Sequence, residues 1–93
     1  MTGAEQIAAE RRRQIDEEGW TEDHDAGHDN ESLALAAAVY ATPADRRTFA
    51  FIDNAPAMWP WHTDDFKPTP NNRVRELVKA GALIAAEIDR LQR

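Results

Sequence analysis

The last twenty or so residues carry the pattern that most constrains the fold. Apolar residues recur there at helical spacing and form one stripe: Val74, Leu77, Val78, Gly81, Ile84, Ala85, Ile88 and Leu91. Asn71 or Asn72 precedes the stripe and can cap the helix with its side chain. Glycine costs about 1 kcal/mol relative to alanine inside a helix. The place of Gly81 within the stripe therefore indicates close contact with another helix.

A second helix is predicted near the N-terminus. Residues 2–5, TGAE, have the S/T-x-x-E form of a capping box, which places the helix start near Gly3 or Ala4. The helix should run to Glu18 and stop at Gly19, a residue suited to the left-handed cap position.

A third helix is predicted from about Glu31 to Ala41, with Asn30 as its cap. Its many alanines favour a helix and allow a neighbouring helix to approach closely. Pro43 follows a capping threonine and indicates a further short helix from Pro43 to about Ile52. The aromatic and branched residues at the end of that stretch could instead form a short strand.

The segment from residue 53 to residue 72 cannot form a long helix, because it contains four prolines. It also carries large apolar side chains that seek burial: Met58, Trp59, Trp61 and Phe66. A long segment of this kind is expected to be functional or clamped by its own side chains. We therefore predict one small all-α domain, residues 1–93, with long N- and C-terminal helices packed together, one or two short helices, and a Trp- and Pro-rich loop between them.

Composition narrows the classes of function. The chain of 93 residues has no cysteine, so neither a disulfide nor a thiolate-bound metal can stabilise it. A domain this small buries roughly 60–65% of its unfolded surface, so we expect a homo-oligomer. No apolar run is long enough to cross a membrane, and no secretion signal is present, so a cytoplasmic location is expected. The net charge of −6 argues against general nucleic-acid binding.

The N-terminal helix places polar residues where a core helix would be apolar. Arg11, Gln14 and Glu18 follow the same face as Ile7 and Ile15. One interpretation is that the three polar residues line a pocket. The other is a buried or interfacial salt-bridge network, or a face that is simply exposed in the monomer.

Two further groups could carry chemistry. His24-Asp25 and His28-Asp29 repeat one dipeptide at a four-residue interval, which could hold a divalent metal but also fits a solvated acidic loop. Trp59, Trp61 and Phe66 offer flat surfaces for a base to stack on, beside cations that could meet phosphate. These cations are Lys67, Arg75 and Lys79. The alternative is that the tryptophans complete a core that the helices cannot fill.

The ordered motifs ERRRQIDEEGW, HDAGH, LALAAAVYA, WPW, FKP and RELVKAGALIAAEIDRL resemble a family of small bacteriophage and prophage proteins. The resemblance covers nearly the whole chain and implies functional roles at a set of mostly polar and aromatic positions. These are Glu10, Arg11, Arg13, Gln14, Glu18, Trp20, His24, Asp25, Tyr40, Trp59, Trp61, Lys67, Arg75, Lys79 and Glu87. The helices also resemble MazG-like nucleotide pyrophosphohydrolases, but this chain lacks their ExxE and ExxD pairs at the matching places.

These observations together predict a phage or prophage accessory protein that binds a nucleotide-derived small molecule, for example to sequester a second messenger of host immunity. The ligand would contact Arg11, Gln14, Glu18, Trp59, Trp61, Lys67, Arg75 and Lys79. One alternative is a nucleotide pyrophosphohydrolase dependent on Mg²⁺ or Mn²⁺. Its metal ligands or bases would be Glu18, His24, Asp25 and Glu87. The other is a protein-interaction module that acts on a host protein.

Overall fold

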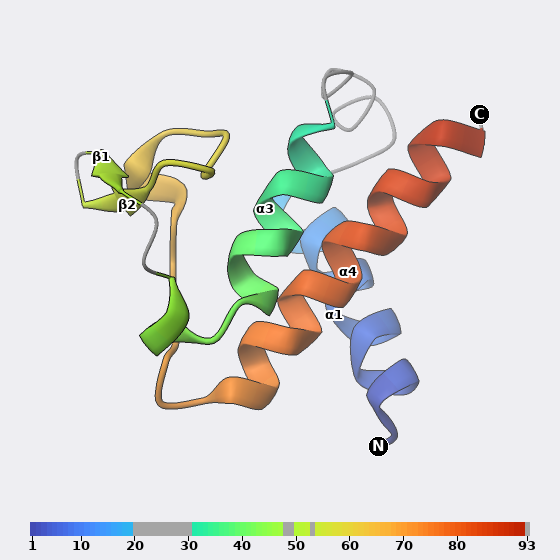
Figure 1. Ribbon diagram of the computed structural model, residues 1–93. Helices are drawn as coiled ribbons and strands as arrows, with labels where there is room; N and C mark the ends of the chain where they lie inside the picture. The colour runs from blue at the N-terminus through green and yellow to red at the C-terminus, as the bar shows by residue number, and fades with distance from the viewer. Residues whose placement is uncertain (20–30, 48–49, 53, 93) are drawn as a thin grey trace.

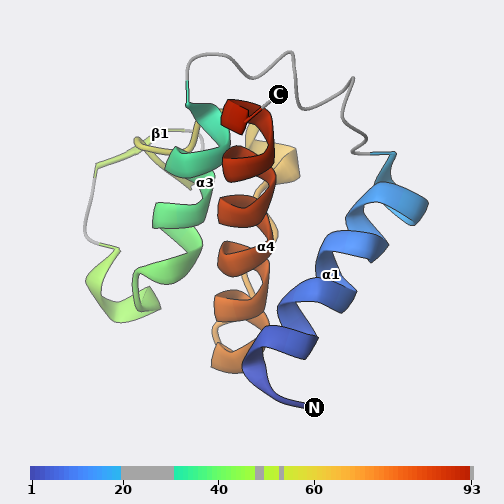
Figure 2. The same ribbon diagram turned by 90° about the vertical axis from the view of Figure 1, so that its right-hand side faces the viewer.

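The computed structural model describes residues 1–19, 31–47, 50–52 and 54–92, and it is mainly helical. The three α-helices are α1 (Gly3–Glu18), α3 (Ser32–Ala41) and α4 (Arg73–Gln92). Helix α4 lies in the middle, with α3 packed against one side of it and α1 against another (Figures 1 and 2). The predicted all-α class and the packing of the two terminal helices are thus confirmed. Among the described helices, none combines the length and apolar composition that a membrane crossing requires.

Helix α1 has the predicted bounds and caps. The Thr2 hydroxyl accepts a hydrogen bond from the Glu5 backbone at 3.1 Å, and the Glu5 carboxylate accepts one from the Thr2 backbone at 2.8 Å. Gly19 ends the helix at φ 73°, in the left-handed region that glycine adopts without strain. Its backbone N–H donates to the Gln14 carbonyl. Local sequence chemistry therefore fixes both ends of this helix.

Helix α3 forms close to its predicted bounds and supplies much of the core. Leu33, Ala36, Ala37, Val39 and Tyr40 are all buried, mostly against α4. The proposed cap Asn30 lies outside the described residues, and Glu31 occupies the cap position at φ 62°.

The predicted helix from Pro43 to Ile52 is wrong. The chain makes a single 3₁₀ turn at Ala44–Arg46, and then a two-strand hairpin of β1 (Phe51–Ile52) and β2 (Ala55–Pro56). Phe51 is opposite Pro56 in this antiparallel pair. The Arg47 side chain turns back to the carbonyls at the end of α3. These tertiary hydrogen bonds hold the backbone of Arg47 at ψ 57°, outside the helical region.

Helix α4 begins where the sequence predicts, with the Asn72 side chain accepting a hydrogen bond from the Arg75 backbone at 3.1 Å. Most of the apolar stripe of α4 is exposed, although its residue Val78 is buried. The other buried positions lie on other faces of the helix: Glu76, Ala80, Ala82, Leu83, Ala86 and Glu87. Small alanines suit the close packing of α3 and α4, while charged residues on this side are paired within the chain.

The contact predicted at Gly81 is present. A Cβ atom at this position would lie 2.5 Å from Cδ1 of Ile7 and 2.8 Å from its Cγ1. Glycine therefore lets the Ile7 side chain of α1 approach the backbone of α4.

Candidate functional site

A cavity of about 450 Å³ opens between the second half of α1, helices α3 and α4, and the Trp- and Pro-rich segment. This volume falls within the range of small-molecule sites in proteins, about 300–1,000 Å³. Its walls combine aromatic, aliphatic and charged side chains from all four regions. The lining residues are Glu10, Arg13, Gln14, Glu18, Leu33, Tyr40, Trp59, Trp61, His62, Asp65, Lys67, Lys79 and Leu83.

One wall is aromatic. The Trp59 ring packs edge-on against Tyr40 at 5.4 Å and Trp61 at 5.3 Å between centroids, and lies 5.1 Å from Phe66. Trp59 is 8% exposed, and its indole N–H donates to the His62 carbonyl at 3.0 Å. Trp59 is thus mainly a core residue, as one interpretation of the sequence held. Trp61 is only partly buried and is the ring with more surface left for a ligand.

The opposite wall contains a buried carboxylate with two arginine partners. Glu10 is 3% exposed and accepts hydrogen bonds from Arg13 at 2.9 Å and from Arg75 of α4 at 2.6 Å. Burial by itself raises the pKa of this carboxyl group. The hydrogen bonds and charges of Arg13 and Arg75 outweigh that effect and lower the pKa from its ordinary 4.5 to about 2. Glu10 is therefore ionised and fixed, and it joins α1 to α4.

Gln14 contributes an unpaired acceptor to the same wall. Its side chain is among the most deeply buried, with the residue 2% exposed. Nε2 donates to Glu10 at 3.2 Å, whereas Oε1 accepts no hydrogen bond from any described residue. A buried amide oxygen without a donor costs about 1–3 kcal/mol. Gln14 belongs to the cavity lining, and its unpaired oxygen is buried within that wall.

The two lysines of the cavity have different roles. The Lys79 ammonium group donates to the Lys67 carbonyl at 2.9 Å and lies 5.4 Å from the centroid of the Tyr40 ring. Burial, followed by the nearby Arg75 charge, lowers the pKa of Lys79. The Lys67 backbone N–H donates to the Tyr40 hydroxyl at 3.0 Å. The Lys67 residue itself is exposed, at the edge of the cavity. Lys79 therefore holds the loop, and Lys67 faces solvent.

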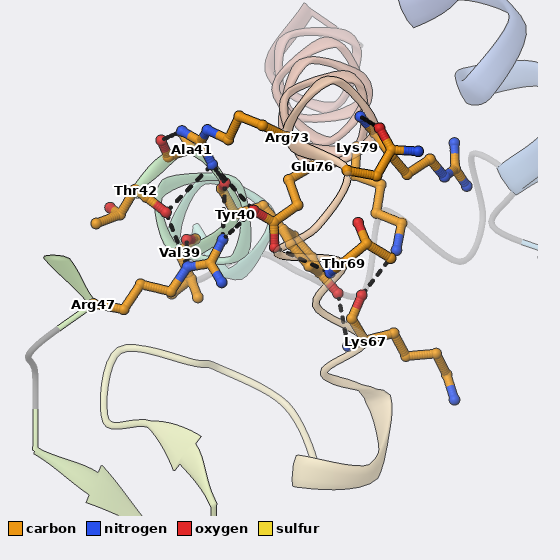
Figure 3. A network of polar contacts seen from close by, with 12 residues as sticks. Val39, Tyr40, Ala41, Thr42, Arg47, Lys67, Thr69, Arg73, Glu76 and Lys79 are labelled. Atoms are coloured by element: carbon orange, nitrogen blue, oxygen red, sulfur yellow. Dashed lines mark hydrogen bonds and ion pairs between the residues drawn. The ribbon is translucent and has the colours of Figure 1, made fainter. Parts of the chain in front are cut away.

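A polar network behind the cavity fixes the loop that forms the aromatic wall (Figure 3). Glu76 is fully buried and pairs with Arg47 at 2.9 Å and Arg73 at 3.3 Å. Its other oxygen accepts a hydrogen bond from the Thr69 backbone at 3.1 Å. Burial alone raises the pKa of Glu76, but the hydrogen bond and charge of Arg47 outweigh it, so this pKa lies below its usual range.

The same two arginines close the C-terminal end of α3. Arg47 Nε donates to the carbonyls of Val39 and Thr42, both at 2.9 Å, and Arg73 donates to the carbonyls of Tyr40 and Ala41. Positive charge at this end of a helix is stabilising, because the last carbonyls lack backbone partners. Arg47 and Glu76 were missed as key residues in the sequence. Arg47 follows the end of α3 and Glu76 lies in the first turn of α4. A charged residue at such a position is usually exposed, so the sequence alone does not reveal that these two are buried.

The structure brings together six of the eight predicted ligand-binding residues. Gln14, Glu18, Trp59, Trp61, Lys67 and Lys79 all line the cavity. The other two do not: Arg11 is not among the lining residues, and the Arg75 guanidinium pairs with Glu10. The salt-bridge interpretation of α1 also holds in part, because Glu18 pairs with Arg13, which in turn pairs with buried Glu10.

The residues proposed as metal ligands are not assembled within the described part of the chain. His24 and Asp25 lie outside the described residues. The Glu87 carboxylate pairs with Arg90 at 2.5 and 3.1 Å and is not on the cavity wall, whereas Glu18 is. Residues 1–19, 31–47, 50–52 and 54–92 contain no cluster of three or more potential metal ligands.

No protein-family model, curated protein or solved structure matches this chain. The chemistry of the cavity is therefore the basis for any functional proposal.

Proposed function

We propose that this chain binds a nucleotide-derived small molecule in the cavity between α1, α3, α4 and the aromatic loop. The observation that carries the proposal is the buried, unpaired Oε1 of Gln14 on the wall of an aromatic cavity. Exocyclic amino groups and ring N–H groups of nucleobases are donors of the kind this oxygen needs. Trp61 offers a partly exposed ring on which a base can stack.

The charges of the residues that line the cavity favour a ligand whose anionic end remains exposed to solvent. Among the described residues, three carboxylates and three cations line the cavity, so their formal charges cancel: Glu10, Glu18, Asp65, Arg13, Lys67 and Lys79. A polyanion buried in the interior would meet these carboxylates. A base held in the interior, with its phosphate at the rim near the exposed Lys67 side chain, avoids that repulsion.

The proposed use of this binding is sequestration, consistent with the resemblance to small phage proteins. A phage accessory protein that holds a nucleotide second messenger would keep it from a host immune effector. Under this proposal the bound nucleotide is released unchanged.

A thermal-shift screen tests the proposal directly. The panel consists of nucleoside mono-, di- and triphosphates, cyclic dinucleotides and ADP-ribose derivatives, each with and without Mg²⁺. At a hundredfold excess over Kd a ligand stabilises its protein by about 2.7 kcal/mol, which is a readily measured shift in Tm. Chromatography of the ligand after long incubation then distinguishes binding from hydrolysis. Absence of any shift across the panel, or conversion of the ligand to products, contradicts the proposal.

Two variants connect binding to the cavity. Gln14→Leu and Trp61→Ala should each weaken binding about tenfold or more, because one removes an acceptor and the other a stacking surface. Ile52→Gln is the matched control, since Ile52 is 62% exposed and is not on the cavity wall. Equal affinity of wild type and both cavity variants would place the ligand elsewhere.

A further inference from the structure

Helix α4 carries an exposed apolar stripe that the rest of the described chain does not cover. Its side chains are Val74, Leu77, Ile84, Ile88 and Leu91, each between 47% and 63% exposed. Together with Gly81 they follow intervals of three, four, three, four and three residues. At about 1.5 Å per residue, this stripe extends along roughly 25 Å of the helix. It is the strongest apolar surface feature of the described molecule.

The spacing of the stripe indicates what kind of surface covers it. Alternating steps of three and four residues average 3.5, the repeat that keeps apolar residues in register along a second helix. Such a seam requires a partner helix crossing at about 20°. Helices α3 and α1 already occupy other faces of α4, and Ile7 of α1 contacts its edge at Gly81. No further helix remains among the described residues to cover the stripe, so we look to another molecule for the partner helix.

We propose that the partner is a second copy of α4, paired antiparallel about a two-fold axis. A two-fold interface needs one self-complementary surface, and the stripe is nearly symmetric about its centre. Antiparallel pairing places Leu77 opposite Ile88 of the other copy, and Val74 and Leu91 then meet at both ends. Ile84 of each copy lies near the centre, beside the edge where Gly81 contacts Ile7 of α1. Each large apolar side chain of the exposed stripe thereby meets apolar surface on the other copy.

The other described helices are poor partners for this seam. The exposed face of α1 carries charged residues, among them Arg12, Asp16 and Glu17. Helix α3 has only 10 residues, and its apolar side chains are mostly buried within the monomer. Helix α4 is thus the described helix whose free face is long and apolar enough to match itself.

The helix dipoles favour the antiparallel direction. The charged side chains of α4 do not decide it, because most of them are paired within the chain: Arg75 with Glu10, Glu76 with Arg47, and Glu87 with Arg90. Antiparallel pairing places the positive end of each helix dipole beside the negative end of the other.

Sedimentation equilibrium over a dilution series tests the dimer. The full chain should approach twice the mass of one chain at high concentration. Leu77→Glu and Ile88→Glu should each raise the dimer Kd by roughly a hundredfold, because a carboxylate would enter the apolar seam. Both side chains are about half exposed in the monomer, so circular dichroism should show unchanged helix content.

The matched control is Ile52→Glu, which places the same charge on an exposed apolar residue (62%) of the hairpin (Figure 1). It should dimerise as the wild type does. A wild-type chain that stays monomeric at every concentration, or a dimer that both glutamate variants leave intact, would overturn the proposal.

Disulfide trapping tests the direction, because the chain has no cysteine of its own. Leu77→Cys and Ile88→Cys should cross-link with each other when the two variants are mixed and oxidised. Each alone should stay largely uncross-linked, since like positions lie about 16 Å apart along an antiparallel pair. Efficient homodisulfides from each variant alone would instead establish a parallel pair and overturn the antiparallel arrangement.

Discussion

Gln14 is the residue on which the proposed ligand site depends most. It is buried in a helix whose other turns are held by ion pairs, and its amide oxygen accepts no hydrogen bond from the described residues. A buried glutamine oxygen without a hydrogen-bond donor lowers the stability of a small domain, so its presence calls for an explanation. A ligand that donates a hydrogen bond to this oxygen would supply one. The unpaired oxygen of Gln14 therefore contributes nothing to folding, and we expect it to serve ligand binding.

Replacing Gln14 with leucine should weaken ligand binding but leave the stability of the unliganded protein nearly unchanged. Removing the unpaired oxygen relieves a desolvation penalty, although the bond from Nε2 to Glu10 is also lost. We expect the free energy of unfolding of the unliganded protein to change by less than about 1 kcal/mol. Urea denaturation of both proteins measures this. A loss of several kcal/mol would show that Gln14 is a structural residue.

Glu10 should make stability depend on pH in the acid range. Its folded-state pKa of about 2 lies below its ordinary 4.5, so the stabilisation is fully present above pH 4.5 and is lost as the pH falls towards 2. Glu10→Gln should be less stable than wild type at pH 6 and should show a flatter profile between pH 4.5 and 2. The control is Asp89→Asn, on the exposed side of α4. Parallel profiles for Glu10→Gln and wild type would contradict this assignment.

At the scale of elements, the Glu76 network joins the end of α3, the start of α4 and the aromatic loop. Arg47 and Glu76 are both nearly fully buried, so removing one charge leaves the other without its partner. Such a change in a buried pair costs about 3–5 kcal/mol. Glu76→Gln should therefore lower the free energy of unfolding by about 3 kcal/mol, as measured by urea denaturation. A cost similar to that of Asp89→Asn would mean that the network is not a structural support.

The contact between α1 and α4 at Gly81 can be tested with a double-mutant cycle. Gly81→Ala improves helix propensity by about 1 kcal/mol, but its Cβ would collide with the Ile7 side chain. Overpacking of this kind costs about 1–3 kcal/mol. The substitution should thus be neutral or destabilising in the wild type and stabilising by about 1 kcal/mol in an Ile7→Ala background. An equal effect in both backgrounds would contradict the contact.

The elements that sequence predicts well are those whose ends are set by local chemistry. The capping box at Thr2, the glycine at position 19 and the Asn72 cap each act within a few residues, so α1 and α4 could be placed from the sequence. The helix predicted from Pro43 failed because Arg47 bonds to carbonyls of α3. Such a bond depends on the tertiary fold and leaves no periodic trace in the sequence.

At the scale of the whole molecule, the apolar stripe of α4 shows a different limit of sequence reasoning. Periodicity identifies an apolar face but not which molecule covers it. Here the small residues and buried ion pairs of α4 face the other helices, while the large aliphatic side chains of the stripe face outward. The candidate site was better predicted, because a polar face on α1 and a run of aromatic residues are both unusual in a plain core. Arg11 and Arg75 were wrongly placed among the predicted ligand contacts, because helix periodicity does not show which charged side chains of a helix point into the cavity.

The cavity and the stripe are separate surfaces, so ligand binding and self-association can be tested independently. No residue of the exposed stripe is among the cavity-lining residues. Leu77→Glu should therefore remove the dimer while leaving ligand affinity within about threefold of wild type, in a calorimetric titration with a ligand from the screen. A much larger loss of affinity would mean that the cavity is complete only in the dimer.

The central claim is that a nucleotide-derived ligand occupies the cavity beside Gln14 and Trp61. The most direct measurement is an NMR titration of the ¹⁵N-labelled chain with each compound of the screen, observing the Gln14 side-chain amide and the Trp61 indole N–H. Both signals should shift saturably with at least one compound, with little change in the backbone amide of Ile52. Shifts confined to other parts of the chain, or no saturable shift with any compound, would contradict it.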